Sequence, residues 1–146
     1  MFPRQLLERI FAWLRPRRRM AGSRGVGQEW ERLAEKHLKR AGYRILDRNV
    51  VTRVGELDFV ARDGTTLCFI EVKGRHGLSF GGPVEAVTPE KQRRIFRAAE
   101  AYLQRHRPER SACRFDVVSI LEEEGEPRVE IVRAAFEGPT RPRLRR

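Results

Sequence analysis

The stretch from Gly55 to Lys73 places the strongest constraint on the fold of this chain. Two apolar segments meet there at Asp63-Gly64, a pair typical of the two-residue turn between antiparallel strands. The sequence therefore predicts a β-hairpin. With Asp63 and Gly64 as the turn, Arg62 would lie opposite Thr65, and the rest of the register would follow from that pair.

Acidic side chains interrupt these apolar strands. The same register would place Asp58 opposite Phe69 and Glu71 opposite Glu56. Because side chains alternate between the faces of a strand, one face is expected to carry Glu56, Asp58, Glu71 and Lys73. Carboxylates that face one another repel unless something positive lies between them.

A divalent metal ion would supply that positive charge. Opposed side chains on paired strands lie about 5 Å apart and diagonal ones roughly 7–8 Å, so Asp58 and Glu71 could hold one ion. Carboxylate oxygens favour Mg²⁺ or Mn²⁺, and Lys73 could orient a water or offset charge on a phosphate. The alternative is an ordinary solvated strand face. The apolar run from Leu67 to Ile70, directly before Glu71, is more typical of a buried strand.

Further motifs occur in one order along the chain. They are Trp30-Glu31-x-x-Ala34, Gly55-Glu56-Leu57-Asp58, Phe69-Ile70-Glu71-Val72-Lys73-Gly74-Arg75, Val87-Thr88-x-x-Lys91-Gln92 and Arg114-Phe115-Asp116-Val117-Val118. This set resembles the YraN family of small bacterial proteins, which is similar to PD-(D/E)XK nucleases and to archaeal Holliday junction resolvases. The resemblance covers about residues 26–121.

The resemblance implies roles for particular residues. Asp58 and Glu71 would be metal ligands, Lys73 the catalytic lysine and Glu31 an acid contributed by a helix. Glu56, expected on the same strand face as Asp58, is a candidate supporting acid apart from the resemblance. The expected activity is a Mg²⁺- or Mn²⁺-dependent endonuclease acting on DNA phosphodiesters, including branched or structured DNA. The alternative is a nuclease fold that binds nucleic acid or a repair partner without cutting.

Basic residues supply candidate contacts to nucleic acid. The chain has 31 Lys and Arg against 20 Asp and Glu, a formal net charge of +11. Much of this charge lies in a basic extension, residues 1–25, and a basic tail, residues 137–146, around a nuclease-like domain at 26–136. Such ends attract phosphate without regard to sequence, or serve only solubility. Within the domain, Arg75, Lys91 and Gln92 are the candidate contacts. DNA is favoured over RNA as the partner, and a homodimer is an open alternative.

The periodicity of apolar residues predicts the order helix, three strands, helix, two strands. The expected ranges are a helix at 28–41 ended by Gly42, a strand at 43–51, the hairpin, a helix from Thr88-Pro89 to about 105, and strands at 114–121 and 128–134. This order matches a restriction-endonuclease-like α-β-β-β-α-β core. The fold class is thus α/β, a mixed sheet flanked by helices. Asp116, an acid in an apolar strand, is expected to form a structural salt bridge.

The remaining features concern location in the cell. Cys68 and Cys113 are predicted to be buried thiols in a reducing compartment. The sequence contains no apolar run of the ~20 residues that span a bilayer, so a cytoplasmic protein is expected. Residues 5–14 could form an amphipathic helix ahead of Arg15–Arg19, and the alternative of a membrane-associated extension stays open.

Overall fold

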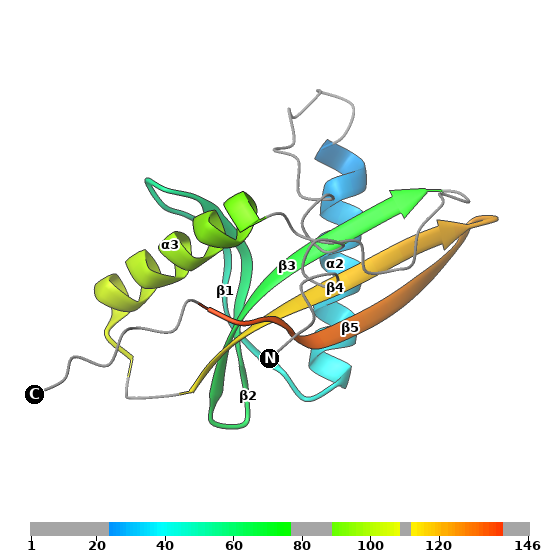
Figure 1. Cartoon of the computed structure of the whole chain (residues 1–146). Helices are drawn as coiled ribbons and strands as arrows, with labels where there is room; N and C mark the ends of the chain where they lie inside the picture. Colours follow the sequence, from blue (N-terminus) through cyan, green and yellow to red (C-terminus); the bar gives the residue numbers. More distant parts are fainter. Residues whose placement is uncertain (1–23, 77–88, 109–111, 139–146) are drawn as a thin grey trace, which may run out of the picture.

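The computed structural model describes residues 24–76, 89–108 and 112–138 (Figure 1). Residues 1–23 of the basic extension and 139–146 of the tail lie outside the described residues, as do the predicted helix at 5–14 and Thr88 at the expected start of the second helix. None of the helices in the described part of the chain is long and apolar enough to cross a membrane.

The elements follow one another in the predicted order. They are α2 (Arg24–Arg40), β1 (Arg44–Val51), β2 (Glu56–Asp63), β3 (Thr66–His76), α3 (Pro89–His106), β4 (Cys113–Glu123) and β5 (Glu126–Phe136). The five strands form one sheet in the order β1-β2-β3-β4-β5. Neighbours are antiparallel except β3 and β4, which are parallel and joined through α3. The predicted α/β fold with an α-β-β-β-α-β core is therefore confirmed, with β5 added at one edge.

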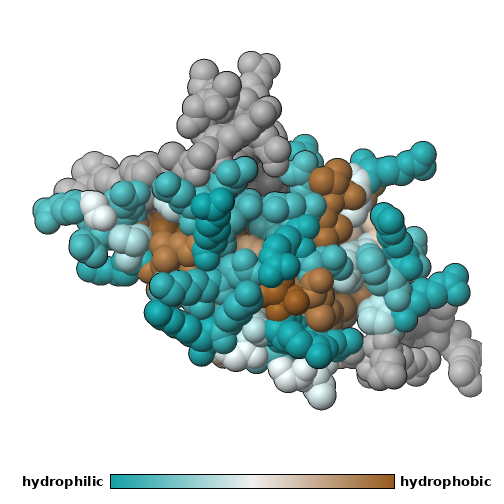
Figure 2. All heavy atoms as spheres, turned by 180° about the vertical axis from the view of Figure 1, so that it is seen from behind, coloured by the Kyte–Doolittle hydropathy of each residue, from teal (hydrophilic) through white to brown (hydrophobic). Residues whose placement is uncertain are grey.

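One helix covers each face of the sheet (Figure 1). On the α3 face, Ile95 and Ala99 pack with strand residues such as Phe69 and Val117. On the α2 face, the buried residues are Ala34, Leu38, Tyr43, Phe59, Ala61, Cys68, Ile70, Val72, Val118 and Ile120. Helices with one apolar stripe and strands buried on both sides produce this three-layer packing. The outer surface in Figure 2 is mostly hydrophilic, with small hydrophobic areas between polar side chains.

Gly42 ends α2, as the sequence predicts. Its φ of 95° is left-handed, a conformation that glycine adopts without steric cost. The N–H of Gly42 donates to the carbonyl of Lys39 at 3.1 Å, and the N–H of Tyr43 donates to that of Leu38 at 3.0 Å. These two bonds satisfy the last carbonyls of the helix in a Schellman motif.

The hairpin turn differs from the prediction by one position. Asp63 pairs with Thr66, so Gly64 and Thr65 are the central residues of the turn. Gly64 has a φ of 60° and Thr65 is not among the positive-φ residues, which fits a type II′ turn that needs glycine first. The predicted pairing of Arg62 with Thr65 was therefore wrong, and Arg62 pairs with Leu67 instead.

The correction moves every pair of the hairpin by two residues. Phe69 lies opposite Val60 rather than Asp58, and Glu71 is correspondingly not the partner of Glu56. Where the two strands pair, at residues 59–63 and 66–70, a shift of two keeps each side chain on its own face, because the side-chain period of a strand is also two.

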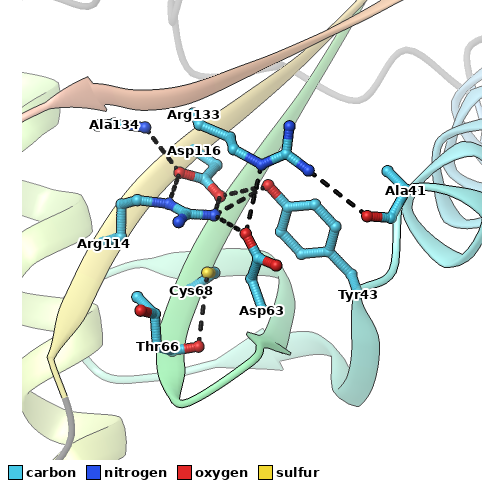
Figure 3. A network of polar contacts seen from close by, with 9 residues as sticks. All are labelled: Ala41, Tyr43, Asp63, Thr66, Cys68, Arg114, Asp116, Arg133 and Ala134. Carbon is cyan, nitrogen blue, oxygen red and sulfur yellow. Dashed lines mark hydrogen bonds and ion pairs between the residues drawn. The ribbon is translucent and has the colours of Figure 1, made fainter.

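Asp116 is the centre of a buried polar network on the α2 face (Figure 3). One carboxylate oxygen accepts from Nε of Arg114 at 2.8 Å and from the N–H of Ala134 at 2.9 Å, and the other accepts from the hydroxyl of Tyr43 at 2.8 Å. The predicted salt bridge is therefore confirmed. Because burial and the bond to Asp116 favour its neutral form, the pKa of Tyr43 lies well above its usual value.

Arg114 extends this network to the hairpin. Its guanidinium also donates to Asp63 at 2.7 Å, and this bond is the main reason why the pKa of Asp63 lies below its usual range. The network thus ties the start of β4 to the end of β2. Of the two thiols, Cys68 is buried as predicted, whereas Cys113 is exposed because it begins β4 at the border of the sheet.

Candidate metal and phosphate site

Strands β2 and β3 separate halfway along the sheet. Their pairing runs from Asp63 and Thr66 to Phe59 and Ile70. Below that point the N-terminal part of β2 stays with β1, whereas β3 continues beside β4 as far as His76. The sheet is thus divided between β2 and β3 from residue 70 onward, and the candidate residues surround this division.

Asp58 lies at the point of separation. Its Oδ2 accepts a hydrogen bond of 2.8 Å from the backbone N–H of Val72, so a side chain takes the place of a carbonyl from the neighbouring strand. Regular alternation fails here, because Leu57 packs on the α3 face and Phe59 on the α2 face. Asp58 is therefore directed at the edge of β3. Continuing the observed register by one residue places it opposite Glu71.

Glu71 and Lys73 follow the fully buried part of β3 and are half-buried. Phe69 belongs to the core on the α3 face, whereas Ile70 and Val72 belong to the core on the α2 face. By this alternation Glu71 and Lys73 both project to the α3 face. The acid and the ammonium thus share a face, one and three residues beyond the last pair of β2 with β3.

Glu31 approaches from the other face. Its neighbour Trp30 packs on Gly74, where a Cβ atom would overlap the indole ring. The helix turn that carries Glu31 therefore lies against the C-terminal half of β3. Glu31 is half-buried, whereas Glu56 is exposed and pairs with Val51 at the end of β2.

The predicted nucleic-acid contacts are spread over two elements. Arg75 lies in β3, where it pairs with Leu121, and Lys91 and Gln92 lie in the first turn of α3. The side chains of Arg75 and Lys91 are outside what the structure describes, and Gln92 is half-buried. All three positions follow Lys73 along the chain.

The donor set around Asp58 suits a cation that needs few protein ligands. Across residues 24–76, 89–108 and 112–138, no three His, Cys, Asp or Glu side chains form a group that could hold a metal ion. Mg²⁺ is commonly held by one or two carboxylates, with waters and substrate phosphates as its other ligands. Asp58 and Glu71 fit that pattern. Two carboxylates are too few for a metal site built from protein ligands alone.

The fold and the site define a class of small α/β proteins in which an aspartate binds the backbone of the next strand where a mixed sheet divides. This chain belongs to uncharacterised protein family UPF0102, the YraN family, whose model matches residues 30–120. That match includes both Glu31 and Lys73, so the resemblance predicted from the sequence is confirmed at the level of the family.

Similar proteins occur in several bacteria. A UPF0102 protein of Anaeromyxobacter sp. strain Fw109-5 is 46% identical over 121 residues, which cover 83% of this chain and 91% of the relative. One from Symbiobacterium thermophilum is 47% identical over 115 residues, 78% of this chain and 98% of the relative. One from Chlorobium phaeobacteroides strain BS1 is 51% identical over 96 residues, 66% and 76% of the two chains.

Proposed function

We propose that this protein is a metal-dependent phosphodiesterase that cuts nucleic acid, with DNA as its substrate. The observation that carries the proposal is the hydrogen bond from the Val72 N–H to Asp58. It fixes this carboxylate beside β3 at the level of Glu71, where the two strands no longer pair.

Each residue then has a distinct task. Asp58 and Glu71 would hold a Mg²⁺ or Mn²⁺ ion, which when bound would polarise the phosphate and lower the pKa of an attacking water. Lys73, on the same face as Glu71, would stabilise negative charge that develops on the phosphate. Glu31 would orient solvent from the α2 face, and Glu56 would act at the exposed rim.

The test is a cleavage screen with end-labelled duplex, flapped, four-way and single-stranded DNA, and with matched RNA, in Mg²⁺, Mn²⁺ or EDTA. We expect cleavage only with a divalent ion. Asp58→Asn and Lys73→Ala should each lower the rate at least 100-fold, because each removes charge from the reacting centre. Asparagine keeps an oxygen acceptor for the Val72 N–H, so the sheet should remain closed.

Matched controls exclude a contaminating nuclease. Glu130→Gln on β5 and Lys36→Ala on α2 change exposed residues of the same types, and they should leave the rate unchanged. Equal cleavage by the wild type and both site variants would overturn the proposal.

A non-catalytic nucleic-acid-binding module is the second candidate function. It is favoured by the hydrogen bond from the Val72 N–H, which already engages one oxygen of the Asp58 carboxylate in the sheet. The two functions separate when DNA affinity and cleavage are followed together during a Mn²⁺ titration. Tight binding without cleavage on all substrates would support the module.

A further inference from the structure

The turn between β1 and β2 exposes apolar side chains. Within the described part of the chain, the exposed large hydrophobic residues are Val51 at 70%, Val54 at 43% and Leu46 at 37%. Val51 and Val54 flank a two-residue segment, Thr52-Arg53, at the tip of this turn. Exposed apolar groups gathered on one short segment are typical of a binding surface rather than of a solvated loop.

The turn is held in a fixed shape. The N–H and the hydroxyl of Thr52 both donate to the carbonyl of Gly55, at 2.9 and 2.7 Å. The hydroxyl oxygen in turn accepts from the N–H groups of Val54 and Gly55. A side chain whose backbone is already ordered loses little conformational entropy when it binds. Val51 and Val54 are therefore held in position before a ligand binds.

Helix α3 lies beside the turn between β1 and β2, as Figure 1 shows. A Cβ atom at Gly55 would lie 3.0 Å from the carbonyl oxygen of Arg94 and 3.5 Å from Cβ of Ala98. This close approach needs glycine at that position. It joins the base of the turn to the middle of the helix, so the tip cannot fold back onto the protein without breaking that contact.

Cationic side chains accompany the apolar tip. Arg53 is exposed in the turn itself, and α3 exposes Arg93, Arg94 and Arg97. Arg94 is paired with Glu90 at 3.1 Å, and such exposed pairs exchange readily with other anions. Arg53 and the α3 arginines outnumber the acid at the base of the turn, Glu56, which pairs with Val51. The net positive charge near the valines complements a polyanion, which distinguishes this surface from an ordinary protein-binding patch.

We propose that the turn at residues 51–55 is a wedge that inserts Val51 and Val54 between bases of a nucleic acid, while Arg53 and the α3 arginines hold the phosphates. Apolar side chains are known to enter base steps in this way, at a cost of a few kcal/mol for unstacking. That cost is least where stacking is already broken. The preferred ligand is therefore DNA that contains a nick, a gap or a flap.

The wedge leads directly into β2, the strand that carries Asp58. Val54 precedes Asp58 by four residues, which is about 13 Å of extended chain and roughly four base steps of DNA. A nucleic acid opened by the wedge would thus pass the carboxylate within a short distance of the opening. The inference deepens the proposed function, on which it rests for its choice of nucleic acid as the ligand.

The test measures binding in EDTA, so that it does not depend on cleavage. The probes are one DNA with 2-aminopurine beside a flap and the same sequence as a continuous duplex. We expect the full-length protein to prefer the flapped DNA and to raise 2-aminopurine fluorescence on it, because insertion unstacks the probe. The double variant Val51→Ser with Val54→Ser should lose the fluorescence rise and bind the flap about fivefold or more weakly. Its affinity for the duplex should stay within twofold.

Two control variants sharpen the result. Leu46→Ser also replaces an exposed apolar residue, but on β1 outside the turn, and it should change neither affinity. Arg53→Gln should weaken the binding of both DNAs, because a phosphate contact does not distinguish them. Thermal unfolding of each variant confirms that the fold is retained.

Each further outcome either supports or overturns the inference. Unchanged preference in the valine variant, an equal loss with Leu46→Ser, or no binding of DNA by the wild type would overturn the inference. An unchanged preference together with altered sedimentation of the valine variant would identify a protein contact instead and would also overturn it. A flap preference that depends on the valines in a protein that never cuts DNA would support the wedge and refute the proposed activity alone.

Discussion

Asp116 and Asp58 show how the surroundings of a carboxylate determine its role. Asp116 accepts hydrogen bonds on both oxygens from Arg114, Tyr43 and Ala134 and is fully buried. Asp116 therefore has a structural role, because the loss of a partner would leave an uncompensated charge in the core. Asp58 instead binds one backbone N–H where two strands part, and it is half-buried.

The contrast predicts a pH-dependent defect in Arg114→Met. Loss of the guanidinium leaves Asp116 buried without the cation that binds it, which typically costs about 3–5 kcal/mol. It also removes the main hydrogen bond of Asp63. In the wild type, Asp63 has a lowered pKa, so its contribution is present above about pH 4 and is lost in acid. The part of the deficit that comes from Asp63 should therefore be present from about pH 5 to 7 and shrink below about pH 4.

Urea unfolding between pH 2 and 7 measures this deficit. The matched control is Arg133→Met, since Arg133 is more exposed and binds Asp63 at 3.3 Å. Exposed pairs contribute about 0–1 kcal/mol, so this control should lose little stability at any pH. A deficit for Arg114→Met at pH 7 that is no larger than that of Arg133→Met would contradict the assignment of Arg114 as the cation that holds Asp116 and Asp63.

At the scale of the element, α2 is positioned by the contact between Trp30 and Gly74. The indole ring occupies the space that the Cβ of any other residue at position 74 would need. Because Glu31 follows Trp30 and Lys73 precedes Gly74, this contact also sets how an acid on α2 stands relative to the lysine of β3. Packing and the proposed chemistry are thus joined through one glycine.

Gly74→Ala is expected to displace α2. Overpacking of a well-packed contact typically costs about 1–3 kcal/mol, so the unfolding midpoint should fall. The proposed cleavage should fall more than stability alone explains at temperatures where the variant is folded. Gly138→Ala is the control, because a Cβ there meets ring atoms only at an ordinary 3.5 Å. Full activity with Gly74→Ala would show that the placement of α2 is irrelevant to the site.

At the scale of the whole molecule, positive charge is concentrated at the ends of the chain. Residues 137–146 hold four arginines and one glutamate. Charges of this kind contribute affinity for any nucleic acid, whereas shape selection requires the ordered domain.

Replacing Arg141, Arg143, Arg145 and Arg146 by Gln should lower the salt dependence of DNA binding. Each arginine that neutralises a phosphate contributes about 0.9 to the slope of log K against log salt, so the slope should fall by up to ~3.6. Fluorescence anisotropy from 50 to 300 mM KCl measures it, and the ratio of flap to duplex affinity is the internal control. A change in that ratio with an unchanged slope would assign the tail to selection instead.

The fold was largely predictable because its signals are local. Apolar spacing located both helices, Gly42 marked the end of α2, and Asp116 was identified as a salt-bridge partner by its apolar context. The hairpin register was not predicted correctly, because Asp63-Gly64 fits two turn types that differ by one residue. The turn that starts at Gly64 is accompanied by tertiary bonds of Asp63 to Arg114 and Arg133, which local sequence does not reveal.

The candidate site was predictable in composition but not in geometry. The motif residues from Asp58 to Lys73 could be selected from the sequence. The division of the sheet and the bond to Val72 could not, because they depend on the path of β2, whose first residues pair with β1 and not with β3. The exposed turn also escaped sequence reasoning. Thr52 three residues before Gly55, with a valine on each side of Thr52-Arg53, is the signal that could have revealed it.

Both outer edges of the sheet are interrupted. β1 has a bulge between Ile45 and Asp47, and β5 is irregular where Ala134 adopts a φ of 49° beside Asp116. β5 also contains Pro127 and charged residues at regular intervals. Edges of this kind resist strand-to-strand polymerisation. A second copy of the chain would therefore have to dock through its side chains, and crowding alone would not drive the protein into fibrils.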